Sequence, residues 1–210
     1  MKQILNKKSG KIAVFVILGC LTISTLIIAM QKQNQPKDIV TEKKRELVNA
    51  PLLKVNEDPA LQTVIENYYK SMLKADQILY ESITISEDDF DPSVVLRQME
   101  YIKGYDNIKV YLANGVGAID YVAFVEYDLK INSIPTGAPS IDRFYITFDD
   151  GLPKIYQKKL TKEEQSNVDF ILNHKEVLEL IQKVDSRLQA AMKADYKLYE
   201  FYQSLSSYES

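Results

Sequence analysis

The stretch that decides the fold is residues 118–131, AIDYVAFVEYDLKI, in which two sets of side chains alternate. Alternation with a period of two is typical of a β-strand, because successive side chains point to opposite faces of a sheet. We therefore predict one long strand with an apolar side that faces a core. That side comprises Ile119, Tyr121, Ala123, Val125, Tyr127, Leu129 and Ile131, and the other side reads Asp120, Val122, Phe124, Glu126, Asp128 and Lys130.

Three shorter strands are predicted around this one. Residues 108–112 precede it across an Asn-Gly turn, and after the loop of residues 132–140 a strand passes through Phe144 and Phe148. An Asp-Gly pair, typical of a tight hairpin, then leads into residues 152–157. Because the turns are short, we expect a four-stranded antiparallel meander.

Helices are predicted before and after these strands. Asp58-Pro59 and Asp91-Pro92 are helix starts, because the Asp side chain accepts free amides and Pro fits the first helical position. Thr161 and Glu164 have the spacing of a capping box. The predicted helices cover residues 58–76, 92–104, 161–173 and 177–191, with a last one that starts at residue 195.

Composition indicates one globular domain. The chain has 210 residues, of which 46% are hydrophobic and 26% charged, values that fit a real core. After residue 30 there are 22 basic and 29 acidic side chains. This acidic balance argues against a nucleic-acid partner, which needs clustered Lys and Arg. The only cysteine, Cys20, precedes the domain, so the domain contains no disulfide.

The N-terminal residues predict a membrane anchor. Residues 12–30, IAVFVILGCLTISTLIIAM, are 19 residues without a charge, and such a helix reaches roughly the 30 Å of a bilayer's hydrocarbon. The basic tail, residues 1–11, favours a cytoplasmic N-terminus and an extracytoplasmic domain in a single-pass topology. Cleavage as a signal peptide, or lipidation at Cys20, stays open. We expect residues 31–57 to be a linker or stalk and residues 58–206 to be the soluble domain.

The order of elements resembles a known superfamily. Residues 89–112, DFDPSVVLRQMEYIKGYDNIKVYL, and residues 121–131, YVAFVEYDLKI, look like membrane-anchored extracytoplasmic members of the nuclear-transport-factor-two-like superfamily in Gram-positive bacteria. The resemblance implies an α+β fold in which helices pack on a curved four-stranded antiparallel sheet. The C-terminal helices are additional to that fold. A similar layout occurs in assembly factors of conjugative type IV secretion systems.

No catalytic or metal-binding constellation is predicted. Steroid isomerases of this superfamily use a buried carboxylate with tyrosine, but the apolar side of the long strand carries no acid beside its tyrosines. His174, the only histidine, lacks partners for metal binding or acid–base catalysis and is interpreted as a capping or solvent residue. The acidic run of residues 87–91 lacks the spacing of a calcium loop. We therefore expect no enzyme activity, cofactor or metal.

Tyrosines provide the candidate contact residues, since the chain has 14 of them and no tryptophan. Most are expected to pack in the core. Tyr145 and Tyr156 are candidates for the rim of a pocket. Tyr196 and Tyr199 fall beside the apolar stripe of the last helix and are candidates for contact with a protein partner.

The sequence thus predicts a membrane-anchored extracytoplasmic binding or scaffolding domain without catalytic activity, with a protein partner in the cell envelope or a secretion assembly. A small-molecule or peptide-binding domain with a cone-shaped pocket is the alternative. The sequence leaves a homo-oligomer open.

Overall fold

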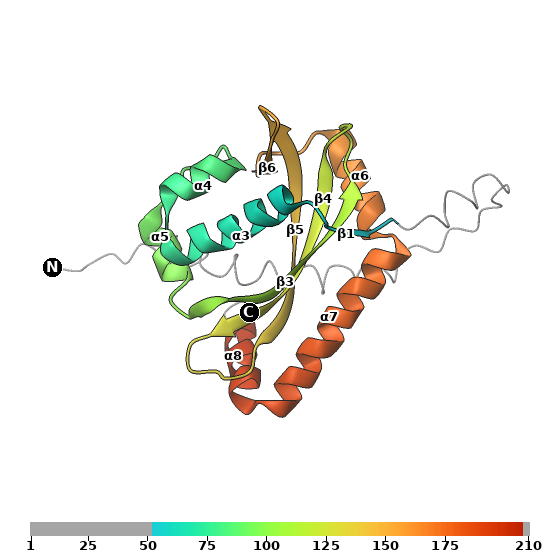
Figure 1. The fold of residues 1–210 in the computed structure, drawn as a ribbon. Coiled ribbons are helices and arrows are strands. Elements are labelled where there is room, and N and C mark those ends of the chain that lie inside the picture. Colours follow the sequence, from blue (N-terminus) through green and yellow to red (C-terminus); the bar gives the residue numbers. More distant parts are fainter. Residues whose placement is uncertain (1–51, 208–210) are drawn as a thin grey trace, which may run out of the picture.

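The computed structural model describes residues 52–207, which form an α+β fold (Figure 1). Within this range six helices flank a six-stranded sheet of order β1-β3-β4-β5-β6-β2. The strands are β1 (Lys54–Val55), β2 (Thr84–Ile85), β3 (Ile102–Asn114), β4 (Tyr121–Ile131), β5 (Ala138–Asp149) and β6 (Leu152–Tyr156). The helices are α3 (Pro59–Lys74), α4 (Gln77–Ile83), α5 (Pro92–Gln98), α6 (Lys162–Leu172), α7 (Lys175–Ala194) and α8 (Tyr196–Ser207).

The predicted four-stranded antiparallel sheet is wrong in strand number and in type. Strands β3 to β6 pair antiparallel in chain order, but β1 adds to β3 and β2 pairs parallel with β6, so the sheet is mixed. Each added strand has two residues, too few to show a periodic pattern. Strand β1 also lies inside the predicted linker of residues 31–57, so the packed part of the chain begins earlier than residue 58.

The second predicted helix is too long. Helix α5 ends at Gln98, and residues 102–104, assigned to that helix, begin β3. Strand β3 has register shifts after Ile102 and between Asp106 and Lys109, and Asn107 has a positive φ of 57°. These β-bulges break the alternation, which explains why only residues 108–112 read as a strand. Helix α4, capped by Asp76, is missing from the prediction because it spans only seven residues.

The predicted helix starts are confirmed. Asp58 accepts the amide of Ala60 at 2.8 Å, and Asp91 accepts that of Ser93 at 2.8 Å. Thr161 and Glu164 form the reciprocal capping box. These signals are local, since donor and acceptor lie within three residues, and so the sequence is sufficient to find them.

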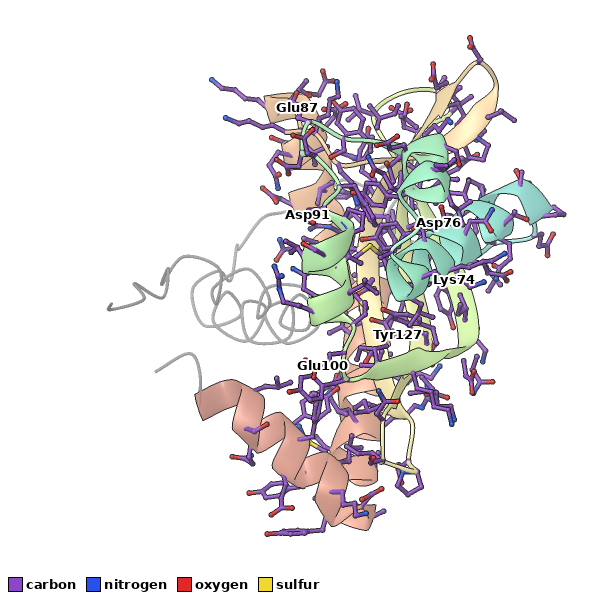
Figure 2. All side chains as sticks on the ribbon, turned by 90° about the vertical axis from the view of Figure 1, so that its left-hand side faces the viewer. Lys74, Asp76, Glu87, Asp91, Glu100 and Tyr127 are labelled. Atoms are coloured by element: carbon purple, nitrogen blue, oxygen red, sulfur yellow. The ribbon has the colours of Figure 1, made fainter. Side chains whose placement is uncertain are left out.

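Strand β4 is buried on both faces. Its apolar side, with Val125 and Tyr127, packs in a core cluster with residues of α3, α4, α5 and α8. Its other side, with Val122 and Phe124, packs in a second cluster with residues of α6 and α7. Figure 2 views the domain from the side of α4 and α5, and there Tyr127 lies between α5 and β3. The sheet is therefore the middle layer between two sets of helices.

The membrane topology predicted from the N-terminal residues is corrected. Within residues 52–207 no helix has both the length and the apolar character needed to cross a bilayer. Helix α7 has 20 residues, but it is amphipathic and charged on one side. This finding contradicts the prediction of a single-pass membrane protein with an extracytoplasmic domain. Residues 1–11 and 12–30, to which the tail and the span were assigned, lie outside the described residues.

Candidate binding site

The candidate site lies where β6 ends. Strand β6 pairs with β5 from the Asp149–Leu152 pair to the Tyr145–Tyr156 pair. Just after β6, the amide of Gln157 donates to the carbonyl of Ile85, the last residue of β2, at 2.8 Å. A cavity of about 340 Å³ is present at this point, which we call the β6-end cavity. It is lined by Tyr68, Val122, Arg143, Phe144, Tyr145, Ile155, Tyr156, Gln157, Lys158, Leu160 and Val168.

Tyr145 forms a fixed wall of the β6-end cavity. Its ring is buried, and its hydroxyl donates to Asp120 Oδ2 at 3.1 Å and accepts the amide of Val116 at 3.3 Å. Thr147 donates to the other oxygen of Asp120 at 2.9 Å. Burial raises the pKa of Tyr145 to about 12, so its hydroxyl stays protonated near neutral pH. The hydroxyl therefore positions the ring and is a poor candidate for a general base.

Glycine in the β3–β4 loop allows this arrangement. A Cβ built on Gly115 falls 2.7 Å from Asp120 Cβ and 3.0 Å from its backbone carbon. Gly115 also donates its amide to the carbonyl of Asp120 at 2.7 Å. The loop therefore closes tightly around the aspartate that holds Tyr145, and a larger residue at position 115 has no room.

Tyr156 lies beside Tyr145 on the paired strand. The two ring centroids are 6.1 Å apart with an edge-to-face angle of 62°, a favourable aromatic geometry. The two residues predicted to rim a pocket therefore line one cavity. Tyr145, however, is a buried wall, and only Tyr156 is partly exposed.

The opposite wall is uncharged. Tyr68 of α3 packs edge-to-face on Phe144 at 5.0 Å, and desolvation raises its pKa above the ordinary tyrosine value. Gln157 accepts a hydrogen bond from the hydroxyl of Tyr80. These groups give the cavity an aromatic side and a hydrogen-bonded amide.

Two cations also line the β6-end cavity. None of the ion pairs found within residues 52–207 involves Arg143 or Lys158. Desolvation lowers the pKa of Arg143, although more than a third of the residue is exposed, and the charge of Asp169 acts in the opposite direction. The guanidinium remains protonated. The cavity therefore carries two positive charges without a carboxylate in contact.

A second polar site lies on the same side of the sheet as Arg143, and two carboxylates meet two cations there. Glu126 is 3% exposed and accepts hydrogen bonds from Arg187 and, at 3.1 Å, from Tyr111, with Lys183 at 3.5 Å. Arg187 also donates to Asp128 at 3.0 Å. We call Glu126, Asp128, Lys183 and Arg187 the clamp, because they join α7 to β4. A cavity of about 440 Å³ adjoins it.

The aromatic side of the sheet does hold an acid–tyrosine pair, which the sequence analysis missed. Tyr69 donates its hydroxyl to Asp142 Oδ2 at 2.9 Å. Asp142 belongs to β5 and Tyr69 to α3, so no pattern within one strand reveals this pair. The ring of Tyr69 stacks on Tyr105 at 4.3 Å and contacts Tyr127 at 5.2 Å. Aromatic rings thus occupy the space beside the carboxylate.

Tyr196 and Tyr199 lie away from the β6-end cavity. They are 69% and 43% exposed, and their ring centroids are 6.2 Å apart in a stacked arrangement. Leu198 and Tyr202 of the same helix are buried. Figure 1 shows α8 and β6 at opposite ends of the sheet. The two predicted tyrosine pairs therefore belong to two separate surfaces.

The remaining candidates have structural roles. His174 is the N-cap of α7 and accepts the amide of Glu176 at 3.4 Å, which confirms the capping interpretation. Asp91, in the acidic run, caps α5. Within residues 52–207 no group of three or more His, Cys, Asp or Glu side chains is arranged to hold a metal.

Comparisons with protein-family models, with curated proteins and with solved structures gave no match. The resemblance to the nuclear-transport-factor-two-like superfamily therefore stays a prediction.

Proposed function

We propose that residues 52–207 form a non-catalytic binding domain whose ligand site is the β6-end cavity. The observation that carries this proposal is the combination of two cations, which have no ion pair within residues 52–207, with a fixed aromatic wall in one concave site. Small-molecule sites usually have an apolar lining with a few polar groups that orient the ligand. The volume of about 340 Å³ lies within their usual range.

The arrangement of acids supports a non-catalytic role. A general base needs a carboxylate within reach of a substrate proton. Glu126 forms ion pairs with two cations. Asp120 accepts hydrogen bonds from the hydroxyls of Tyr145 and Thr147 and from the amide of Gly117. The carboxylate of Asp142 is bonded to Tyr69 under packed rings. None of these acids lines the β6-end cavity.

A thermal-shift screen with a variant that fills the cavity tests the proposal. Ligands raise the melting temperature by mass action. Leu160→Trp places a large ring in the cavity, whereas Leu152→Trp, at the exposed β5–β6 turn, is the matched control. We expect compounds that stabilise the wild type and Leu152→Trp but not Leu160→Trp. Compounds that stabilise all three proteins equally would contradict this site.

A protein partner on α8 is the second candidate function. Tyr196 and Tyr199 are exposed and lie next to each other on one side of the helix. Aromatic side chains are enriched in protein interfaces because they bury a large area with little loss of conformational entropy. The partner is either another protein or a second copy of this chain.

Cross-linking in intact cells, with mass spectrometry, tests this surface. Replacing both tyrosines with Ser should leave the melting temperature nearly unchanged and remove the cross-linked partner. Phe170→Ser, at another exposed aromatic residue on α6, should keep it. The surface is wrong if both variants retain the partner, or if the double variant loses several kcal/mol, as truncated core aromatics do. A cross-link between two copies of the chain would identify a homo-oligomer.

A further inference from the structure

The charge of the β6-end cavity is opposite to that of the rest of the domain. Residues 52–207 contain 17 Lys and Arg against 25 Asp and Glu. The side chains that line the cavity include Arg143 and Lys158 but no acid. The cavity beside the clamp, by contrast, is lined by Glu126 and Asp128 as well as by cations. The β6-end cavity is therefore positively charged, whereas the domain as a whole is acidic.

Neighbouring acids do not neutralise these cations by contact. Asp169 of α6 influences Arg143 electrostatically, but its carboxylate accepts a hydrogen bond from Gln165 at 2.7 Å. Glu164 influences Tyr145, and its carboxylate accepts the amide of Thr161 at 2.7 Å in the capping box. Both acids are thus engaged within α6. An anion in the cavity would supply the missing partner.

From these observations we propose that the β6-end cavity selects a planar, apolar ligand that carries one anionic group, held by Arg143 and Lys158. The inference rests on the proposed function, since it specifies the ligand of the same site. Arginine presents a planar fork that matches the two oxygens of a carboxylate or a phosphate, and lysine adds a point charge. Arg143 is exposed and Lys158 partly exposed, whereas Tyr145 and Phe144 of the same cavity are buried, so the anion and the apolar part of the ligand have separate places.

The aromatic wall determines the shape of the apolar part. Tyr145 cannot rotate away, because Asp120 and Val116 hold its hydroxyl. Tyr156 meets it edge-to-face, and Leu160 and Val168 complete this side. A flat ring packs well against such a wall. Aromatic carboxylates and aromatic phosphate monoesters share the required chemistry.

Calorimetric titration of the full-length protein with three probes tests the proposal. The probes are 2-naphthoate, 2-naphthyl phosphate and uncharged 2-naphthamide. We expect at least one of the two anions to bind about tenfold or more tightly than the amide, because only an anion forms charge-assisted hydrogen bonds with Arg143 and Lys158. The stronger anion identifies carboxylate or phosphate as the preferred group. Equal affinity for the amide and both anions would overturn the proposal.

Variants separate the anion contact from the cavity itself. Arg143→Gln and Lys158→Gln should each weaken the anion about tenfold and leave the amide unchanged, while Lys159→Gln, at an exposed neighbour, should change neither. Arg143→Lys should recover part of the loss by restoring charge without the fork. Unchanged anion binding in both glutamine variants would refute the ligand class.

The two proposals fail in different ways. If screened compounds bind in the cavity of the wild type but neither naphthyl anion binds, the ligand class is wrong and the binding function stands. If no compound distinguishes Leu160→Trp from the wild type and no probe binds, both proposals are wrong.

Discussion

Glu126 of the clamp and Arg143 of the β6-end cavity lie on the same face of the sheet, and the two sites differ in how their charges are paired. In the clamp, two carboxylates meet two cations, and the carboxylate at its centre, Glu126, is almost fully buried. In the cavity, Arg143 and Lys158 have no ion pair among the described residues. Paired charges at a helix–sheet contact fix the position of α7. Unpaired cations at a concave surface are available to a ligand.

The clamp should show the largest effect on stability. Arg187→Gln leaves Glu126 with Lys183 as its only cationic partner, and breaking a buried pair usually costs about 3–5 kcal/mol. Arg187 is 41% exposed, so we expect about 2–3 kcal/mol from urea unfolding. Glu126→Gln should cost less, because the released cations can reach water. Lys175→Gln, in an exposed pair on the same helix, serves as control and should cost under about 0.5 kcal/mol. A loss as small as that of the control would show that the clamp does not hold α7.

The loop that positions Tyr145 should show a medium effect. Gly115→Ala places a Cβ against the backbone of Asp120, and such overpacking costs about 1–3 kcal/mol. Gly104→Ala is the matched control, because a Cβ there meets no atom within 4 Å. Thermal and urea unfolding of both variants measures the difference. If the two variants are equally stable, the loop is free to move, and Tyr145 is not a fixed wall.

A partly buried contact of Glu176 should contribute less to stability than the clamp. Glu176 accepts the amides of Leu52 and Leu53 at 3.1 and 3.0 Å, and the Leu53 hydrogen bond is the main cause of its lowered pKa. A lowered pKa means that the contribution is present above the ordinary glutamate value, about 4.3, and is lost as the pH falls through the lower folded value. We expect about 0.5–1 kcal/mol.

Amide hydrogen exchange at Leu52 and Leu53, followed across acidic pH, measures this contact. Protection should fall as Glu176 becomes protonated, and Glu176→Gln should remove the pH dependence. Protection that is independent of pH in the wild type would mean that other contacts hold these residues.

Local signals explain what the sequence could predict. The alternation in β4 identified the aromatic core side with Val125 and Tyr127, and the helix caps were found at Asp58, Asp91 and Thr161. In each case the pattern lies within one element. The Asp-Gly turn after β5 is also present, with positive φ at Asp150 and Gly151.

Contacts between distant segments could not be predicted. Arg187 lies 61 residues from Glu126, and no pattern around α7 indicates that this side chain reaches β4. Arg143 lies opposite Phe124 on β5, and its neighbours Phe144 and Ile146 are apolar. The sequence pattern therefore indicates only an ordinary solvent-facing residue. The cavity lies at the end of β6, which pairs on one edge with β5 and on the other with β2, a strand of two residues. Tyr145 and Tyr156 could be predicted as pocket residues because both are tyrosines at strand positions of the sequence.

The most direct test of the account compares the unfolding free energies of Arg143→Gln and Arg187→Gln in the same buffer without ligand. Both changes remove one guanidinium from the same face of the sheet. The account predicts that Arg187→Gln loses about 2–3 kcal/mol, whereas Arg143→Gln stays within about 0.5 kcal/mol of the wild type, because an unpaired surface cation contributes little. An equal loss in the two variants would contradict the distinction between a clamp that holds the fold and a cavity that is open to a ligand.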